Sequence, residues 1–171
     1  MTGTPTEAKA AQVRRVPMGS VPDLVGGPEA VVTAAYLRIE GDVRGHMLLM
    51  LPLQDGASLA SMLLGEPVEP LLDLSEMARS ALGEAGNIIG SFFIGALADA
   101  TRLELSPSPP AVMVDMSGAV LDVVLADLAE ESEDVLVIDT VFTQSRHQVK
   151  AVFLVLPRQS YFATILERLP K

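Results

Sequence analysis

Cysteine and tryptophan are absent from this chain of 171 residues, and aromatic residues make up only 4% of it. The absence of cysteine excludes a disulfide framework, thiolate catalysis and a cysteine-based zinc site. Basic residues are scarce, since 12 Lys and Arg are outnumbered by 22 Asp and Glu, which gives a formal net charge of -10. A nucleic-acid binder needs a basic face for the phosphates, and an anionic membrane surface repels such a charge. We therefore expect neither nucleic acid nor a membrane as a partner.

Long apolar runs are also missing, although hydrophobic residues make up 49% of the chain. The longest are strand-sized, such as Met47 to Leu53 and Ala151 to Leu156, whereas a membrane helix needs roughly 20 apolar residues. The N-terminus carries charged residues and no apolar block, which is not typical of a secretory signal. The sequence predicts a cytoplasmic domain large enough to bury its own core.

Two β-hairpins are the clearest local signals. The first pairs Val31–Ile39 with Val43–Leu51 across a Glu-Gly-Asp turn, and the second pairs Val135–Phe142 with Val149–Leu156. Each ends at a Leu-Pro pair, and the two pairs lie 105 residues apart. This repeat predicts an α+β fold, with an antiparallel sheet, long helices packed on one side of it, and two pseudo-symmetric hairpin–helix halves.

The rest of the chain divides into shorter elements around one long helix. Residues 1–12 are expected to be a tail or the end of a truncated first helix, and residues 13–171 a single domain. Helices are predicted at 57–64 (capped by Asp55), 72–100, 119–128 and 160–169, short strands at 102–105 and 112–116, and an acidic turn at 130–134.

The long helix carries a polar stripe. Ser80, Glu84 and Asn87 recur at i, i+4 and i+7, so they fall within about 60° of one another on a helix. The opposite side is expected to pack on the core, through Ala78, Leu82, Ala85, Ile89, Phe93 and Ala96. The same helix holds four glycines, each costing about 1 kcal/mol relative to alanine. They indicate that something approaches the helix backbone closely; packing inside the domain would explain them equally well.

The spacing Ser80-x3-Glu84-x2-Asn87-x22-Pro110 resembles the signature of the CheC/CheX/FliY phosphatases, which act on phosphorylated CheY in chemotaxis. The first hairpin, 37–45, also resembles that family. Because CheC members carry two such helices and only one is visible here, the resemblance implies a single active centre or a truncated form.

The resemblance implies a role for each residue. Asn87 would position the water that attacks an aspartyl phosphate, while Glu84 would pair with the regulator's lysine and fix docking. Ser80 and Pro110 would support them, Pro110 by shaping the backbone. No metal of the protein's own is implied, because the magnesium ion lies on the regulator. His46 and His147 have no ligand-spaced partners and are expected to be ordinary surface or core residues.

Two other interpretations stay open. The chain could be a non-catalytic adaptor that docks a regulator, a flagellar-switch protein or a CheD-like deamidase, the last on helix 119–128 with Asp122 and Asp127 exposed. It could also be a structural subunit whose polar stripe is buried in an oligomer. Burial of Glu84 and Asn87 within the single chain would exclude both regulator-binding interpretations.

Overall fold

The computed structural model describes residues 5–128 and 134–168, so most of the acidic turn expected at 130–134 lies outside the described residues. The strands are β1 (Glu7–Pro17), β2 (Val31–Gly41), β3 (Gly45–Pro52), β4 (Leu105–Pro107), β5 (Ala111–Met116), β6 (Asp134–Gln144) and β7 (His147–Pro157). The helices are the 3-10 helix η1 (Met18–Val25) and the α-helices α1 (Leu53–Leu64), α2 (Glu76–Thr101), α3 (Ser117–Leu128) and α4 (Gln159–Arg168).

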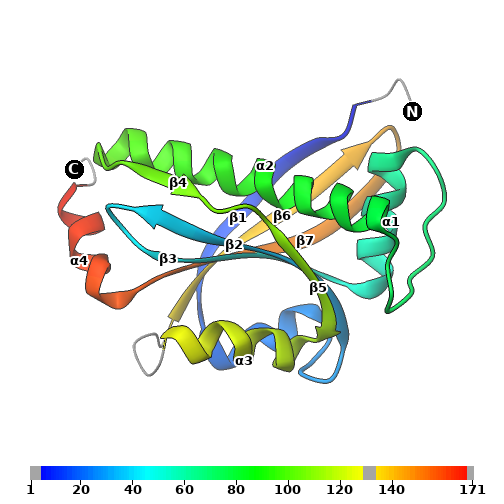
Figure 1. The fold of residues 1–171 in the computed structure, drawn as a ribbon, viewed down its shortest axis with the longest axis horizontal. Coiled ribbons are helices and arrows are strands. Elements are labelled where there is room, and N and C mark those ends of the chain that lie inside the picture. Colours follow the sequence, from blue (N-terminus) through cyan, green and yellow to red (C-terminus); the bar gives the residue numbers. More distant parts are fainter. Residues whose placement is uncertain (1–4, 129–133, 169–171) are drawn as a thin grey trace.

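The described strands form one antiparallel sheet in the order β1-β6-β7-β3-β2, and β4 and β5 both pair with β2. The two predicted hairpins, β2–β3 and β6–β7, are therefore confirmed, and they lie next to each other with β3 and β7 paired at the centre. The predicted α+β class with an antiparallel sheet is also confirmed. Because β4 and β5 pair with β2 alone among the described strands, they form this edge of the sheet; β4 runs alongside α2, and β5 leads from α2 toward α3 (Figure 1).

Helices cover both faces of this sheet, which corrects the expectation of helices on one side. One face packs against α1 and α2 around fully buried residues such as Leu37, Met47 and Phe153. The other face packs against η1 and α3 around Leu48 and Leu154. Figure 1 shows α2 on one side of the sheet and α3 on the other. The two sets alternate along each strand because successive side chains point to opposite faces.

The alternation of side chains between the two faces of the sheet also corrects the 105-residue offset of the internal repeat. A shift of 105 residues superposes Met47 on Val152, yet Met47 belongs to the α2 face and Val152 to the η1 face. Only an even shift keeps side chains on the same face. The observed pairing places Leu49 opposite Phe153, so a two-fold axis at this point implies a shift of 104. Two-fold symmetry of the halves stays a prediction.

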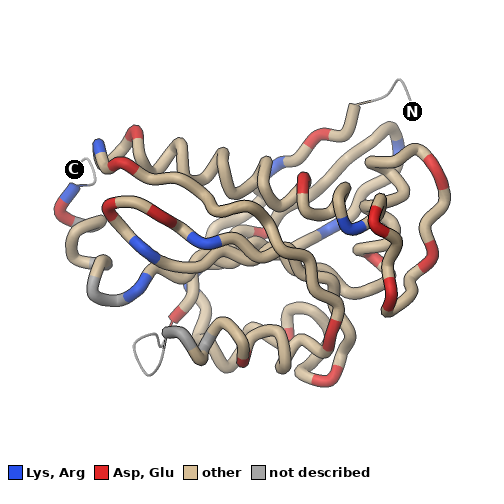
Figure 2. The backbone as a smooth tube through the Cα atoms, viewed as in Figure 1, with Lys and Arg blue, Asp and Glu red and all other residues tan. Residues whose placement is uncertain are grey.

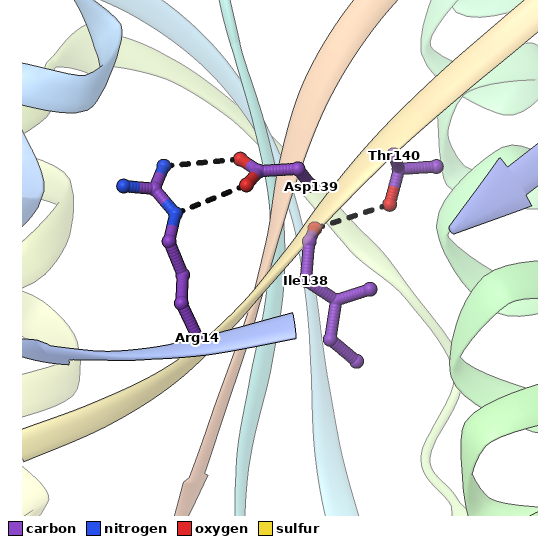
Figure 3. A network of polar contacts seen from close by, with 4 residues as sticks. All are labelled: Arg14, Ile138, Asp139 and Thr140. Atoms are coloured by element: carbon purple, nitrogen blue, oxygen red, sulfur yellow. Dashed lines mark hydrogen bonds and ion pairs between the residues drawn. The ribbon is translucent and has the colours of Figure 1, made fainter. Parts of the chain in front are cut away.

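Residues 7–17 form the edge strand β1, so the prediction of a tail or helix end over residues 1–12 is wrong for residues 7–12. β1 pairs with β6 along its length, with one register irregularity between Ala10 and Gln12. Arg14 donates to both carboxylate oxygens of Asp139, at 3.0 and 3.1 Å, and this bidentate pair joins the two strands (Figure 3). The sheet domain thus starts before residue 13.

Candidate active site on helix α2

Helix α2 begins at Glu76, four residues later than the sequence pattern suggests, because Ser75 caps it. The Ser75 hydroxyl accepts a hydrogen bond from the Ala78 backbone N–H at 3.2 Å, which satisfies one of the free donors at a helix start. The helix ends where Arg102 adopts the left-handed conformation and its N–H donates to Ala98 at 2.7 Å. The predicted long helix is confirmed with these bounds.

Glycines bring α2 unusually close to the sheet. A β-carbon placed on Gly86 would lie 2.6 Å from the β-carbon of Ala35, and one on Gly90 would lie 3.4 Å from Leu37 and Met47 side-chain atoms. The inward face is therefore rotated from the predicted one: Gly86, Gly90 and Ile94 are buried, while Ala96 is exposed and Ile89 and Phe93 are half-buried. A hydrophobic pattern does not indicate that Gly86 and Gly90 face inward, because glycine has no hydrophobic side chain. Packing within the domain accounts for Gly86, while Gly90 lies in ordinary contact distance of Leu37 and Met47.

The polar stripe points outward, as predicted. Ser80 and Glu84 are exposed, and Asn87, one turn beyond Glu84, is half-buried. Ser91 continues the stripe and is exposed. Burial of Glu84 and Asn87 would have excluded both regulator-binding interpretations. Because the two residues are accessible in the single chain, both interpretations remain possible.

Pro110 lies against the same part of α2. A β-carbon on Gly83 would lie 3.4 Å from Pro110 Cγ and 3.5 Å from Val112 Cγ2. Since Gly83 is next to Glu84 and one turn from both Ser80 and Asn87, Pro110 borders the stripe. A β-carbon at position 83 would be in ordinary van der Waals contact with Pro110. The structure thus brings all four residues of the predicted spacing to one area.

The segment before Pro110 is anchored on β2. Ser108 is 3% exposed, and its hydroxyl accepts from the Arg38 backbone N–H at 2.7 Å while its own N–H donates to the Arg38 carbonyl at 2.9 Å. Ser108 thus continues the β2–β4 pairing by one residue. A buried serine before two prolines carries no sequence signal of such a role, so sequence reasoning missed it.

Arg79 is a second residue that sequence reasoning missed. Its Nε donates to the Leu74 carbonyl at 3.3 Å and its Nη1 donates to the Val112 carbonyl at 3.1 Å. The side chain therefore connects the start of α2 with the start of β5. Nothing in the local pattern distinguishes this arginine from a solvated one on an amphipathic helix.

An apolar groove of about 400 Å³ lies beside α2, over β1 and β6. Its walls include Ile88 and Phe92, which are 55% and 81% exposed, and Ile138 and Phe142 from the sheet. The helix carries no charged residue between Glu84 and Asp99 (Figure 2). By length and composition α2 is the one described helix that could cross a membrane, but its glycines pack directly on the sheet.

Neither histidine belongs to a cluster of His, Asp and Glu side chains suited to a metal within the described residues. His46 is buried at 4% exposure, and its Nδ1 forms a 2.5 Å hydrogen bond with the Tyr36 hydroxyl, with the two rings stacked. His147 is exposed at the start of β7. Among the deamidase-docking candidates, Asp122 on α3 is exposed, while the side chain of Asp127 lies outside the described part.

Comparison with known proteins identifies the family. Residues 77–114 match the CheC-like family, and this segment contains Ser80, Glu84, Asn87 and Pro110. The chain is 40% identical over 144 residues to the CheY-P phosphatase CheC of Bacillus subtilis, an alignment covering 82% of this chain and 69% of that protein. The chain belongs to the CheC-like family.

Solved structures support the CheC-like fold. The Thermotoga maritima FliY structure has a TM-score of 0.69 and 20% identity, covering 97% of this chain and 82% of that one. A Borrelia burgdorferi CheX, solved in complex with CheY, BeF3 and Mg, has a TM-score of 0.53 and 18% identity, covering 86% and 84%. At these identities the likeness establishes the fold alone.

Proposed function

We propose that this CheC-like protein hydrolyses the aspartyl phosphate of a phosphorylated CheY-type response regulator, with Glu84 and Asn87 acting from one exposed face of α2. The observation that carries the proposal is that Pro110 lies against Gly83, beside the outward-facing Glu84 and Asn87, in a chain 40% identical to a CheY-P phosphatase. The site would be part of the cytoplasmic chemotaxis machinery.

Hydrolysis of an aspartyl phosphate requires of the protein mainly that it position a water molecule. An oxygen–phosphorus bond forms between water and the phosphoryl group, and the bond from phosphorus to the aspartyl oxygen breaks. The regulator regains its free carboxylate, and inorganic phosphate leaves as H2PO4−, which carries the oxygen and both protons of the water. In phosphoryl transfer, proteins contribute mainly alignment and electrostatic support. An asparagine side chain suits this task, since its carbonyl accepts from water and its amide donates to a phosphoryl oxygen.

Each residue has a separate part in this proposal. Asn87 aligns the water, and its half-buried position restricts the side chain. Glu84, which is exposed, pairs with a lysine of the regulator and fixes the docking register. Ser80 supports the contact surface one turn earlier, and Pro110 forms a rigid border next to Gly83. The protein supplies no metal to this reaction; the regulator brings its own magnesium ion.

The test distinguishes an enzyme from an adaptor. Candidate CheY-type regulators are phosphorylated with acetyl phosphate, separated from it, and followed by phosphate release with and without catalytic amounts of the protein. We expect faster release with multiple turnovers. Binding of the BeF3-activated regulator without any acceleration would instead identify an adaptor and contradict the proposed hydrolysis.

A further inference from the structure

Arg79 occupies a position from which one side chain controls the border of the site. It is half-buried on the first turn of α2, one residue before Ser80 and one turn before Gly83. Its guanidinium donates to two backbone carbonyls that lie 38 positions apart in sequence, Leu74 and Val112. The planar guanidinium holds several donors in a fixed geometry, so such a double contact restricts both carbonyls.

The Val112 contact ties the segment that follows Pro110 to α2. β5 begins at Ala111, directly after Pro110, and pairs with β2 alone among the described strands. Its other edge therefore has no strand to hold it, and Arg79 supplies a donor from α2 on that side. The Val112 side chain also lies within van der Waals distance of the space beside Gly83.

Pro110 thus lies between two residues that are held by hydrogen bonds, Ser108 and Val112. Ser108 fixes the chain on β2 two residues before it, and Arg79 fixes it on α2 two residues after it. The Ser108 contacts and the pairing of Ala111 with Tyr36 hold Pro110 on β2, so loss of the Arg79 anchor would change the position of Pro110 relative to α2. The Ser108 anchor belongs to the sheet, whereas the Arg79 anchor comes from the helix that carries Glu84 and Asn87.

We propose that Arg79 is a positioning residue for the phosphatase reaction: by holding Val112 it keeps Pro110 at a fixed distance from the Glu84–Asn87 face. The inference rests on the proposed function. Arg79 does not touch the regulator's phosphate in this account; it acts through Pro110. Small displacements of a bordering group lower the rate of a reaction that depends on alignment.

The experiment compares kcat and KM of two Arg79 variants with those of a control variant at another arginine. Arg79→Met keeps the apolar stem and removes both donors, and we expect kcat to fall about tenfold while KM changes less than about twofold. Arg102→Met removes the same charge at the far end of α2 and should leave both constants unchanged. Arg79→Lys keeps the charge but can reach one carbonyl at a time, and should give an intermediate kcat.

A double-mutant cycle tests whether Arg79 acts through Pro110. Pro110→Ala alone should also lower kcat, and the Arg79→Met/Pro110→Ala double variant should be no slower than the slower single variant. Additive losses would contradict the proposal. All rates are taken well below each variant's unfolding temperature; should Arg79→Met not fold, the cycle is run with Arg79→Lys.

Failure of this inference is separable from failure of the proposed function. If Asn87→Ala abolishes turnover while Arg79→Met, or Arg79→Lys in its place, retains wild-type kcat, the positioning role is wrong and the phosphatase site stands. If Asn87→Ala retains wild-type turnover, the proposed function itself is wrong.

Discussion

The two ends of helix α2 pack in different ways. In the first part, Gly83, Gly86 and Gly90 each lie against another segment, namely Pro110, Ala35 and Leu37. In the last part, Gly95 has no atom within 4 Å of the place where a β-carbon would lie, and Phe92 is 81% exposed. Glycine is therefore a steric requirement at position 86, where a β-carbon would lie 2.6 Å from Ala35, and an unneeded cost at position 95.

The difference teaches why the site lies where it does. The first part of α2 is held by the Ser75 cap, by Arg79 and by close contact with β2. Catalytic groups need a rigid support that keeps their geometry, and Glu84 and Asn87, the residues proposed to act in catalysis, lie in this part. The open groove over β1 and β6 borders α2 from Ala85 to Ala96.

Three substitutions compare the two parts of α2. Of these, reversing the charge of Glu84 should have the largest effect. We expect Glu84→Lys to weaken regulator binding at least about tenfold, because an attractive contact with a lysine becomes a repulsive one. The affinity for a BeF3-activated regulator is measured by titration. Glu76→Lys makes the same charge change at an exposed position two turns earlier and should have a much smaller effect; equal affinities of the two variants would contradict the docking role.

Gly86→Ala should destabilise the fold. The added methyl would lie 2.6 Å from the Ala35 β-carbon, so α2 or β2 must shift. Overpacking of this kind costs about 1–3 kcal/mol, which exceeds the gain of about 1 kcal/mol from alanine's helix propensity. Denaturant unfolding should show a lower free energy of unfolding. An unchanged midpoint would mean that α2 does not approach the sheet this closely.

Gly95→Ala is the matched change at the other end and should have the smallest effect, with the opposite sign. Its position is exposed and open, so the methyl gains helix propensity without a clash, worth about 0.5–1 kcal/mol. The same unfolding measurement should show a higher midpoint for this variant. A loss of stability as large as that of Gly86→Ala would remove the distinction between the two ends.

Local patterns were sufficient to predict the hairpins, most helices and the outward direction of the polar stripe. Alternating β-branched residues and turn signals mark β2–β3 and β6–β7, and the i, i+4, i+7 spacing places Ser80, Glu84 and Asn87 on one side whatever the rotation of the helix. These features depend on residues close together in sequence.

Features set by distant contacts could not be predicted. β1 is rich in Ala, Lys, Gln and Arg and largely exposed, so neither propensity nor burial marks it as a strand; its pairing with β6 forms it. The inward rotation of α2 depends on Gly86 meeting Ala35, and the border of the site depends on Arg79 meeting Val112. No short-range pattern records either contact.

The central claim is that Asn87 aligns the attacking water. Phosphate release is measured from a phosphorylated regulator in single-turnover reactions, with Asn87→Ala in saturating excess. The account predicts a loss of roughly 10²-fold or more, as when a positioned polar group is removed from a transition state. Regulator affinity should stay near wild type, and Ser91→Ala, on the same exposed stripe, should release phosphate normally. Wild-type rates with Asn87→Ala would contradict the account.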